Sequence, residues 1–116
     1  MRVLFDKNVP RGVRQFLGRH QVETVDERGW ARISNGELIR VAEVAGFEVI
    51  LTADQNIIYQ QNLKERRIAL VVLGSNIWPI VRMHTAAITA QVDVAQPGSY
   101  AFIEMSIPAK HEQAKS

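Results

Sequence analysis

The chain has 116 residues, of which 47% are hydrophobic and 22% charged, and 14 basic against 12 acidic residues give a net charge of +2. These totals fit one ordinary globular domain, and the lack of cysteine excludes a disulfide framework, a thiolate metal site and a cysteine nucleophile. The opening apolar run is too short for a secretory signal, and the sequence holds no stretch of roughly 18 apolar residues that would span a membrane. We therefore expect a cytoplasmic protein without a membrane partner.

Short apolar runs alternate with longer segments of helical periodicity. In chain order, the sequence predicts a strand at 2–5, a helix at 10–18, a strand at 21–25, a helix at 34–46, a strand at 48–51, a helix at 56–65, a buried strand at 68–73, a helix at 78–90 and an edge strand at 100–105. This alternation indicates an α/β domain over residues 1–105, with a mainly parallel sheet of about five strands and helices on both faces. The polar residues 106–116 are expected to form a flexible tail.

Helix boundaries follow from four signals. Pro10 suits the first turn of its helix. Ser34 and Glu37 have the spacing of a capping box, in which each side chain bonds the other residue's backbone. Gly46 is expected to end that helix. Trp78 is expected to pack at a helix start rather than to stack on a base.

The loop from Arg28 to Arg32 places Trp30 between two cations. Aromatic and arginine side chains are enriched at the centres of interfaces, so we hypothesise a protein or RNA contact there. The alternative is that Trp30 belongs to the core.

Three acids follow or precede strands at places that a parallel sheet brings together. Asp6 ends the first strand, Asp54 lies just past the third, and Glu37 lies on the first turn of the helix before the third strand. Ligands of open α/β sheets bind outside the carboxyl ends of the strands. Clustered carboxylates repel unless a cation joins them, and Mg²⁺ or Mn²⁺ prefers such ligands and can activate a water or polarise a phosphate. Each acid has a plainer alternative as a cap or turn residue.

The first forty residues carry eight basic and five acidic residues, and the remainder carry six and seven. The basic excess therefore lies beside Asp6, where it would favour a phosphate backbone. Solvated arginines on helix surfaces are the alternative. Lys7, Arg11 and Arg14 belong to this excess, and we expect them to contact such a phosphate backbone.

Four motifs occur in an order that resembles a known family: LFDKNVP, SNGELI, ILTADQNI and IALVVL. Together they resemble the PIN-like domains of short bacterial proteins related to VapC-type toxins, over about residues 1–75. The resemblance implies a three-layer PIN-like fold and a Mg²⁺- or Mn²⁺-dependent ribonuclease. It also implies a toxin neutralised by a small antitoxin protein, and a homodimer is a further expectation.

The resemblance assigns the catalytic metal site to Asp6, Glu37 and Asp54, supporting roles to Asn8 and Thr52, and RNA binding to the basic residues beside Asp6. Asn35 and Asn56 stand where the family carries further acids, and we expect both to support the site through their amides. An amide oxygen offers a dipole where a carboxylate offers a charge. The alternative function is a catalytically weakened PIN-like module that acts by binding protein or RNA.

Overall fold

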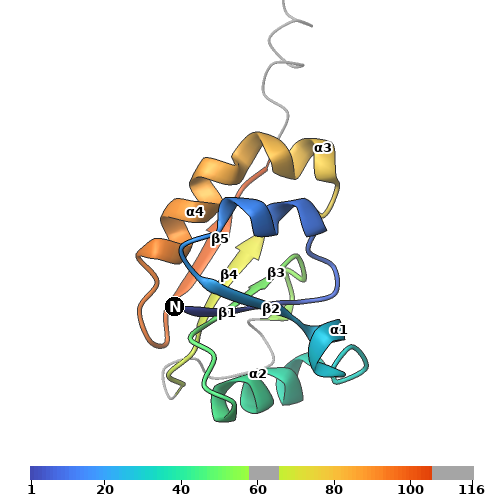
Figure 1. Cartoon of the computed structure of the whole chain (residues 1–116), viewed down its shortest axis with the longest axis vertical. Helices are drawn as coiled ribbons and strands as arrows, with labels where there is room; N and C mark the ends of the chain where they lie inside the picture. Colours follow the sequence, from blue (N-terminus) through green and yellow to red (C-terminus); the bar gives the residue numbers. More distant parts are fainter. Residues whose placement is uncertain (58–65, 106–116) are drawn as a thin grey trace, which may run out of the picture.

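The structure is a computed structural model that describes residues 1–57 and 66–105. Its centre is one sheet of five parallel strands in the order β2-β1-β3-β4-β5 (Figure 1). The strands are β1 (Arg2–Phe5), β2 (Gln21–Thr24), β3 (Val49–Thr52), β4 (Ala69–Leu73) and β5 (Tyr100–Ile103). Every residue of β3 and β4 is buried, as expected of central strands covered on both faces. The predicted α/β class with a parallel five-stranded sheet is confirmed.

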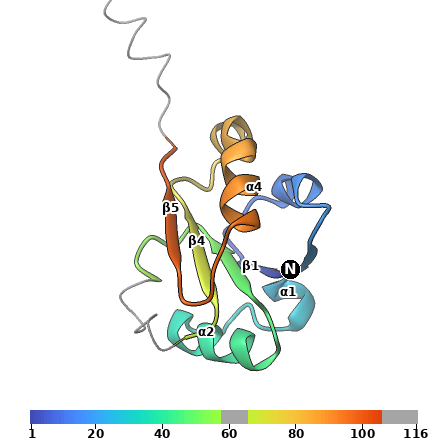
Figure 2. The same cartoon turned by 90° about the vertical axis from the view of Figure 1, so that its left-hand side faces the viewer.

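Helices cover both faces of this sheet (Figures 1 and 2). One face carries the 3₁₀ helix η1 (Arg11–Phe16) with α3 (Trp78–Val81), η4 (Arg82–His84) and α4 (Thr85–Asp93). The other carries α1 (Val25–Arg28) and α2 (Asn35–Val44).

Two hydrophobic clusters follow from the alternation of side chains along the strands. Phe5 belongs to the cluster under η1 and α4, whereas its neighbour Leu4 belongs to the cluster under α2. In the described part of the chain, no helix is long and apolar enough to cross a membrane.

The connections reverse direction between β1 and β3. From β1 the chain crosses to β2 on one side, and β3, β4 and β5 then extend the sheet on the other side. Such a switch point opens a crevice at the carboxyl ends of the two strands, and open α/β sheets bind their ligands there. The residues that follow β1 and β3 therefore occupy the position in this fold that is best suited to a site.

Several of the predicted helices and strands begin or end at other residues in the structure. The helix predicted over 10–18 is the shorter 3₁₀ helix η1, with Pro10 at its N-cap position. The helix predicted over 78–90 is three consecutive pieces that end at Asp93. The strand predicted to end at Val25 ends at Thr24, because Val25 begins α1. Residues 58–65 of the helix predicted over 56–65 lie outside the described residues.

The capping box predicted at Ser34 does not form. Ser34 is the N-cap of α2, but within the described residues its side chain makes no capping bond. Glu37 instead bonds Arg40 one turn further on, because a charge-assisted bond is stronger than one to a neutral backbone N–H. A complete capping box occurs between Thr24 and Glu27, at the start of α1. The predicted end of α2 holds, since Gly46 follows it with a φ of 93°.

Both tryptophans pack against the protein. Trp78 lies over Gly12, where an added Cβ would stand 2.5 Å from the indole ring, so Trp78 is the packing residue that the sequence predicts. Trp30 is half-buried and meets the ring of Phe47 edge-on, with the ring centroids 6.1 Å apart. The guanidinium of Arg28 stacks over both rings, at 5.2 Å and 5.0 Å from their centroids.

Candidate active site at the carboxyl ends of β1 and β3

Asp6 is a buried carboxylate at the end of β1, with 8% of its surface exposed. Its backbone N–H continues the sheet by donating to the carbonyl of Leu51 at 2.9 Å, so the β1–β3 pairing fixes its position. Its Oδ1 accepts from the N–H of Lys7 at 2.8 Å, and its Oδ2 accepts from the hydroxyl of Thr52 at 2.7 Å. The carboxylate is thus held by short, local bonds and caps no helix.

Thr52 is the link between the two strand ends. Its side chain is fully buried, and its hydroxyl accepts from the N–H of Asp54 at 3.0 Å while it donates to Asp6. The amide oxygen of Asn8 accepts from the N–H of Ala53 at 2.9 Å and lies 3.5 Å from the same hydroxyl. One hydroxyl and one amide therefore tie the loop after β1 to the loop after β3.

Asp54 is fixed on both carboxylate oxygens. Its Oδ1 accepts from the backbone N–H of Asn56 at 2.9 Å, and its Oδ2 accepts from the side-chain amide of Asn35. Asn35 is the first residue of α2, so this bond places the start of α2 at the carboxyl edge of the sheet, as the sequence predicts. Asn56 contributes its backbone to this arrangement, and its side chain is exposed.

Glu37 lies on the same turn of α2 but does not join the two aspartates. Its exposed carboxylate is paired with Arg40, and this hydrogen-bonded guanidinium lowers the pKa of Glu37. Among the described residues, no three acidic, histidine or cysteine side chains gather closely enough to hold one metal ion between them. The structure therefore links the carboxylate of Asp6 to the backbone of Asp54 through Thr52, attaches Asn8 and Asn35 to this network, and leaves Glu37 outside it.

Neither Asp6 nor Asp54 forms an ion pair with any described residue, and of the described acids without an ion pair Asp6 is the buried one. Buried charges are almost always paired or bound to a metal, because desolvation penalises an isolated one. Neutral donors hold Asp6 and Asp54 in place but supply no full positive charge. The buried carboxylate of Asp6 is therefore suited to a cation from outside the described chain, and the half-buried Asp54 is linked to it through the Thr52 hydroxyl.

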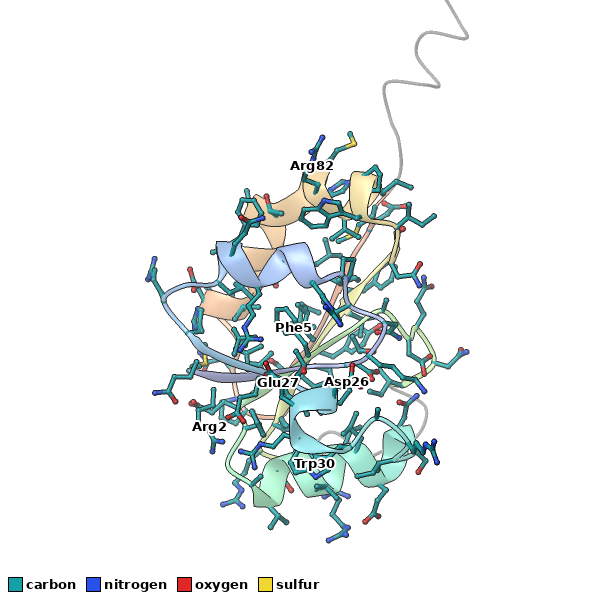
Figure 3. All side chains as sticks on the ribbon, turned by 45° about the vertical axis from the view of Figure 1, so that its right-hand side comes forward. Arg2, Phe5, Asp26, Glu27, Trp30 and Arg82 are labelled. Carbon is teal, nitrogen blue, oxygen red and sulfur yellow. The ribbon has the colours of Figure 1, made fainter. Side chains whose placement is uncertain are left out.

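A cavity of about 420 Å³ adjoins Asp6 on the side away from β3, between η1 and α1. Its charged lining consists of Asp6, Lys7, Arg11, Arg14, Asp26 and Glu27. The three basic residues that the sequence assigns to RNA thus share one cavity next to the buried aspartate. Figure 3 shows Asp26 and Glu27 at the end of α1 that faces Phe5 of β1.

The sequence reasoning missed Thr24, Asp26 and Glu27 as parts of this region. Their signal was present, because T-x-x-E directly after a strand is the pattern of a capping box. The capping box turns the chain into α1 and presents both acids to the cavity. Bonds from the side chain of Arg14 and the backbone of Thr24 lower the pKa of Glu27.

Comparison with protein-family models, with curated proteins and with solved structures finds no match to this chain. The resemblance to PIN-like domains thus remains an interpretation of four short motifs.

Proposed function

We propose that the chain is a PIN-like ribonuclease that depends on Mg²⁺ or Mn²⁺, with Asp6 and Asp54 as its principal metal ligands. The observation that carries this proposal is the buried Asp6 carboxylate. This carboxylate has no cationic partner among the described residues. It accepts a hydrogen bond from the Thr52 hydroxyl, which in turn accepts one from the backbone N–H of Asp54. Its location at the β1/β3 switch point adds support, because ligands of this sheet topology bind there.

The donor set fits such a metal. Mg²⁺ is commonly held by one or two carboxylates, together with water and the phosphates of a substrate, so a third protein carboxylate is not required. Carboxylate and amide oxygens of the kind found on Asp6, Asp54 and Asn8 suit Mg²⁺ and Mn²⁺ better than they suit softer ions. Glu37 becomes a third ligand only if its carboxylate leaves Arg40.

Each role in this proposal belongs to a side chain whose position the structure defines. When bound, the metal would supply a polarised phosphate and an activated water. Thr52 orients Asp6, and Asn35 orients Asp54. Lys7 and Arg11, on the cavity side of Asp6, would bind the RNA phosphates through charge-assisted bonds. The two aspartates and the basic rim thus divide metal binding and substrate binding between them.

A second function, a binding module that has lost catalysis, is favoured by one specific contact. The amide of Asn35 donates directly to Asp54 and so supplies, within the chain, part of the positive field that a metal would provide. Both Asn35, whose amide occupies an oxygen of Asp54, and Glu37, whose carboxylate is paired with Arg40, are expected to weaken metal binding at this site. In either function we propose that the partner is RNA, and that a small antitoxin protein covers the acidic edge of a toxin.

Cleavage of single-stranded RNA with and without Mn²⁺ tests the first function against the second. We expect wild-type cleavage that EDTA abolishes and that Asp54→Asn reduces by at least about 10-fold, since the loss of even a group that orients a metal ligand typically costs about 10–100-fold. The matched control is Glu104→Gln, an exposed acid next to β5. RNA binding without metal-dependent cleavage would favour the binding module. Cleavage that Asp54→Asn and Glu104→Gln affect equally would refute the site.

A further inference from the structure

The cavity beside Asp6 is not a simple anion site, because its charges are already partly matched. Arg14 donates to Glu27 at 2.9 Å and to the carbonyl of Val22 at 2.7 Å. This pair therefore belongs to the wall of the cavity, where it fixes α1 against η1. The remaining charged groups of the lining are then Asp6, Lys7, Arg11 and Asp26.

Three of these groups are available to a ligand. The side chains of Arg11 and Asp26 are exposed, and neither makes a hydrogen bond or an ion pair with another described residue. The side chain of Lys7 makes only a 3.5 Å contact, with the carbonyl of Ala31, among the described residues. The cavity thus offers the guanidinium of Arg11 from η1, the amine of Lys7 near the loop that follows α1, and the free carboxylate of Asp26 from α1.

We infer that this cavity is the subsite for one nucleotide of the RNA, next to the phosphate at the metal site, and that it prefers guanine. The inference rests on the proposed function for the identity of the substrate. Arg11 and Lys7 bind the phosphate of this nucleotide. Asp26 accepts hydrogen bonds from its base.

The preference for guanine follows from the chemistry of a free carboxylate. A carboxylate has two acceptor oxygens and no donor. Guanine presents two adjacent donors on its pairing edge, a ring N–H and an amino group, whereas uracil presents a single N–H between two carbonyls. Bases of single-stranded RNA are read through these edges. The volume of about 420 Å³ lies within the 300–1,000 Å³ range of small-ligand pockets, and Phe5 and Val9 add apolar lining for a base.

Titration of the whole protein with each of the four ribonucleoside 5′-monophosphates, in EDTA and followed by NMR, tests the inference without requiring catalysis. We expect GMP to shift amides near residues 6–14 and 24–27 and to bind about tenfold more tightly than UMP. Arg11→Ala should weaken all four nucleotides by roughly the same factor, about fivefold or more, since a phosphate contact carries no base information. Asp26→Asn should remove most of the difference between GMP and UMP.

The control is Arg82→Ala, which removes an exposed cation at the opposite end of the molecule from α1 (Figure 3). Amide shifts that avoid the cavity, or equal effects of Arg11→Ala and Arg82→Ala, would overturn the subsite. A GMP preference that survives Asp26→Asn would overturn the role of Asp26. If the protein binds GMP at the cavity but cleaves no RNA, the proposed ribonuclease function is wrong and the nucleotide subsite stands. If it cleaves RNA but binds no nucleotide at the cavity, the subsite is wrong and the ribonuclease function stands.

Discussion

Replacing Thr52 by valine should destabilise the protein out of proportion to the size of the change. Valine has nearly the shape of threonine and suits a β-strand at least as well, so packing and backbone propensity are preserved. What disappears is one fully buried hydroxyl. That hydroxyl donates to the carboxylate of Asp6 and accepts from the N–H of Asp54.

The magnitude follows from the two bonds. A hydrogen bond to a charged group contributes about 1.5–3 kcal/mol, and a buried donor left without its acceptor costs about 1–3 kcal/mol. Burial of the new methyl group offsets roughly 1 kcal/mol of this loss. We therefore expect Thr52→Val to lower the free energy of unfolding by about 2–4 kcal/mol, a large part of the roughly 5–15 kcal/mol that holds an ordinary domain together.

Urea unfolding followed by circular dichroism measures this change, with Thr52→Ser as the matched control. Serine keeps the hydroxyl and removes one buried methyl group, so it should cost only about 1 kcal/mol. If Thr52→Val is as stable as the wild type, or if the serine variant loses as much as the valine variant, the hydroxyl does not link the two strand ends and the described site is wrong.

Three further changes test other parts of the structure. Gly12→Ala should lower the melting temperature by several degrees because its methyl group meets the indole of Trp78 at 2.5 Å, and the loss should shrink in a Trp78→Leu background. Burial favours the neutral form of Glu43, but the N–H of Arg67 and other bonded groups outweigh it and lower its pKa. The ionised carboxylate of Glu43 should therefore stabilise the fold above pH 4.5, and this stabilisation should be lost as the pH falls through the lower pKa of the folded state. Glu43→Gln should then reduce the dependence of the free energy of unfolding on pH in the acidic range. Trp30→Ala should lower the melting temperature by several degrees, whereas an unchanged melting temperature with weakened association would restore the interface hypothesis.

The order of strands and helices was predictable because burial dominates it. The runs Val49–Leu51 and Ala69–Leu73 are apolar on both faces, and such short runs between helical segments are typical of central parallel strands. The sequence did not reveal where β2 ends, because Thr24 serves both as the last strand residue and as the cap of α1. Val25 is apolar in either element, so hydrophobic pattern alone could not separate them.

The candidate site was predictable as far as backbone topology determines it. Parallel strands place the residues after β1 and β3 at one edge, and Asp6 and Asp54 meet there for that reason. The partner of Glu37 was not predictable, because it depends on which of two local bonds the side chain makes. The cavity with Asp26 was also missed, since it exists only when the tertiary fold packs η1 against α1.

Thermal unfolding with and without Mn²⁺, on the wild type and on Asn35→Asp, tests the central claim most directly. Asn35 is the position to change because its amide contacts the carboxylate of Asp54, so aspartate there faces a like charge. The metal-free variant should melt below the wild type, and Mn²⁺ should raise its melting temperature by more than it raises that of the wild type, since a ligand that binds only the folded state stabilises it. Asp54→Asn should remove the effect of Mn²⁺ in both backgrounds. Equal Mn²⁺ shifts in all of these proteins, or no shift in any of them, would contradict a metal site at Asp6 and Asp54.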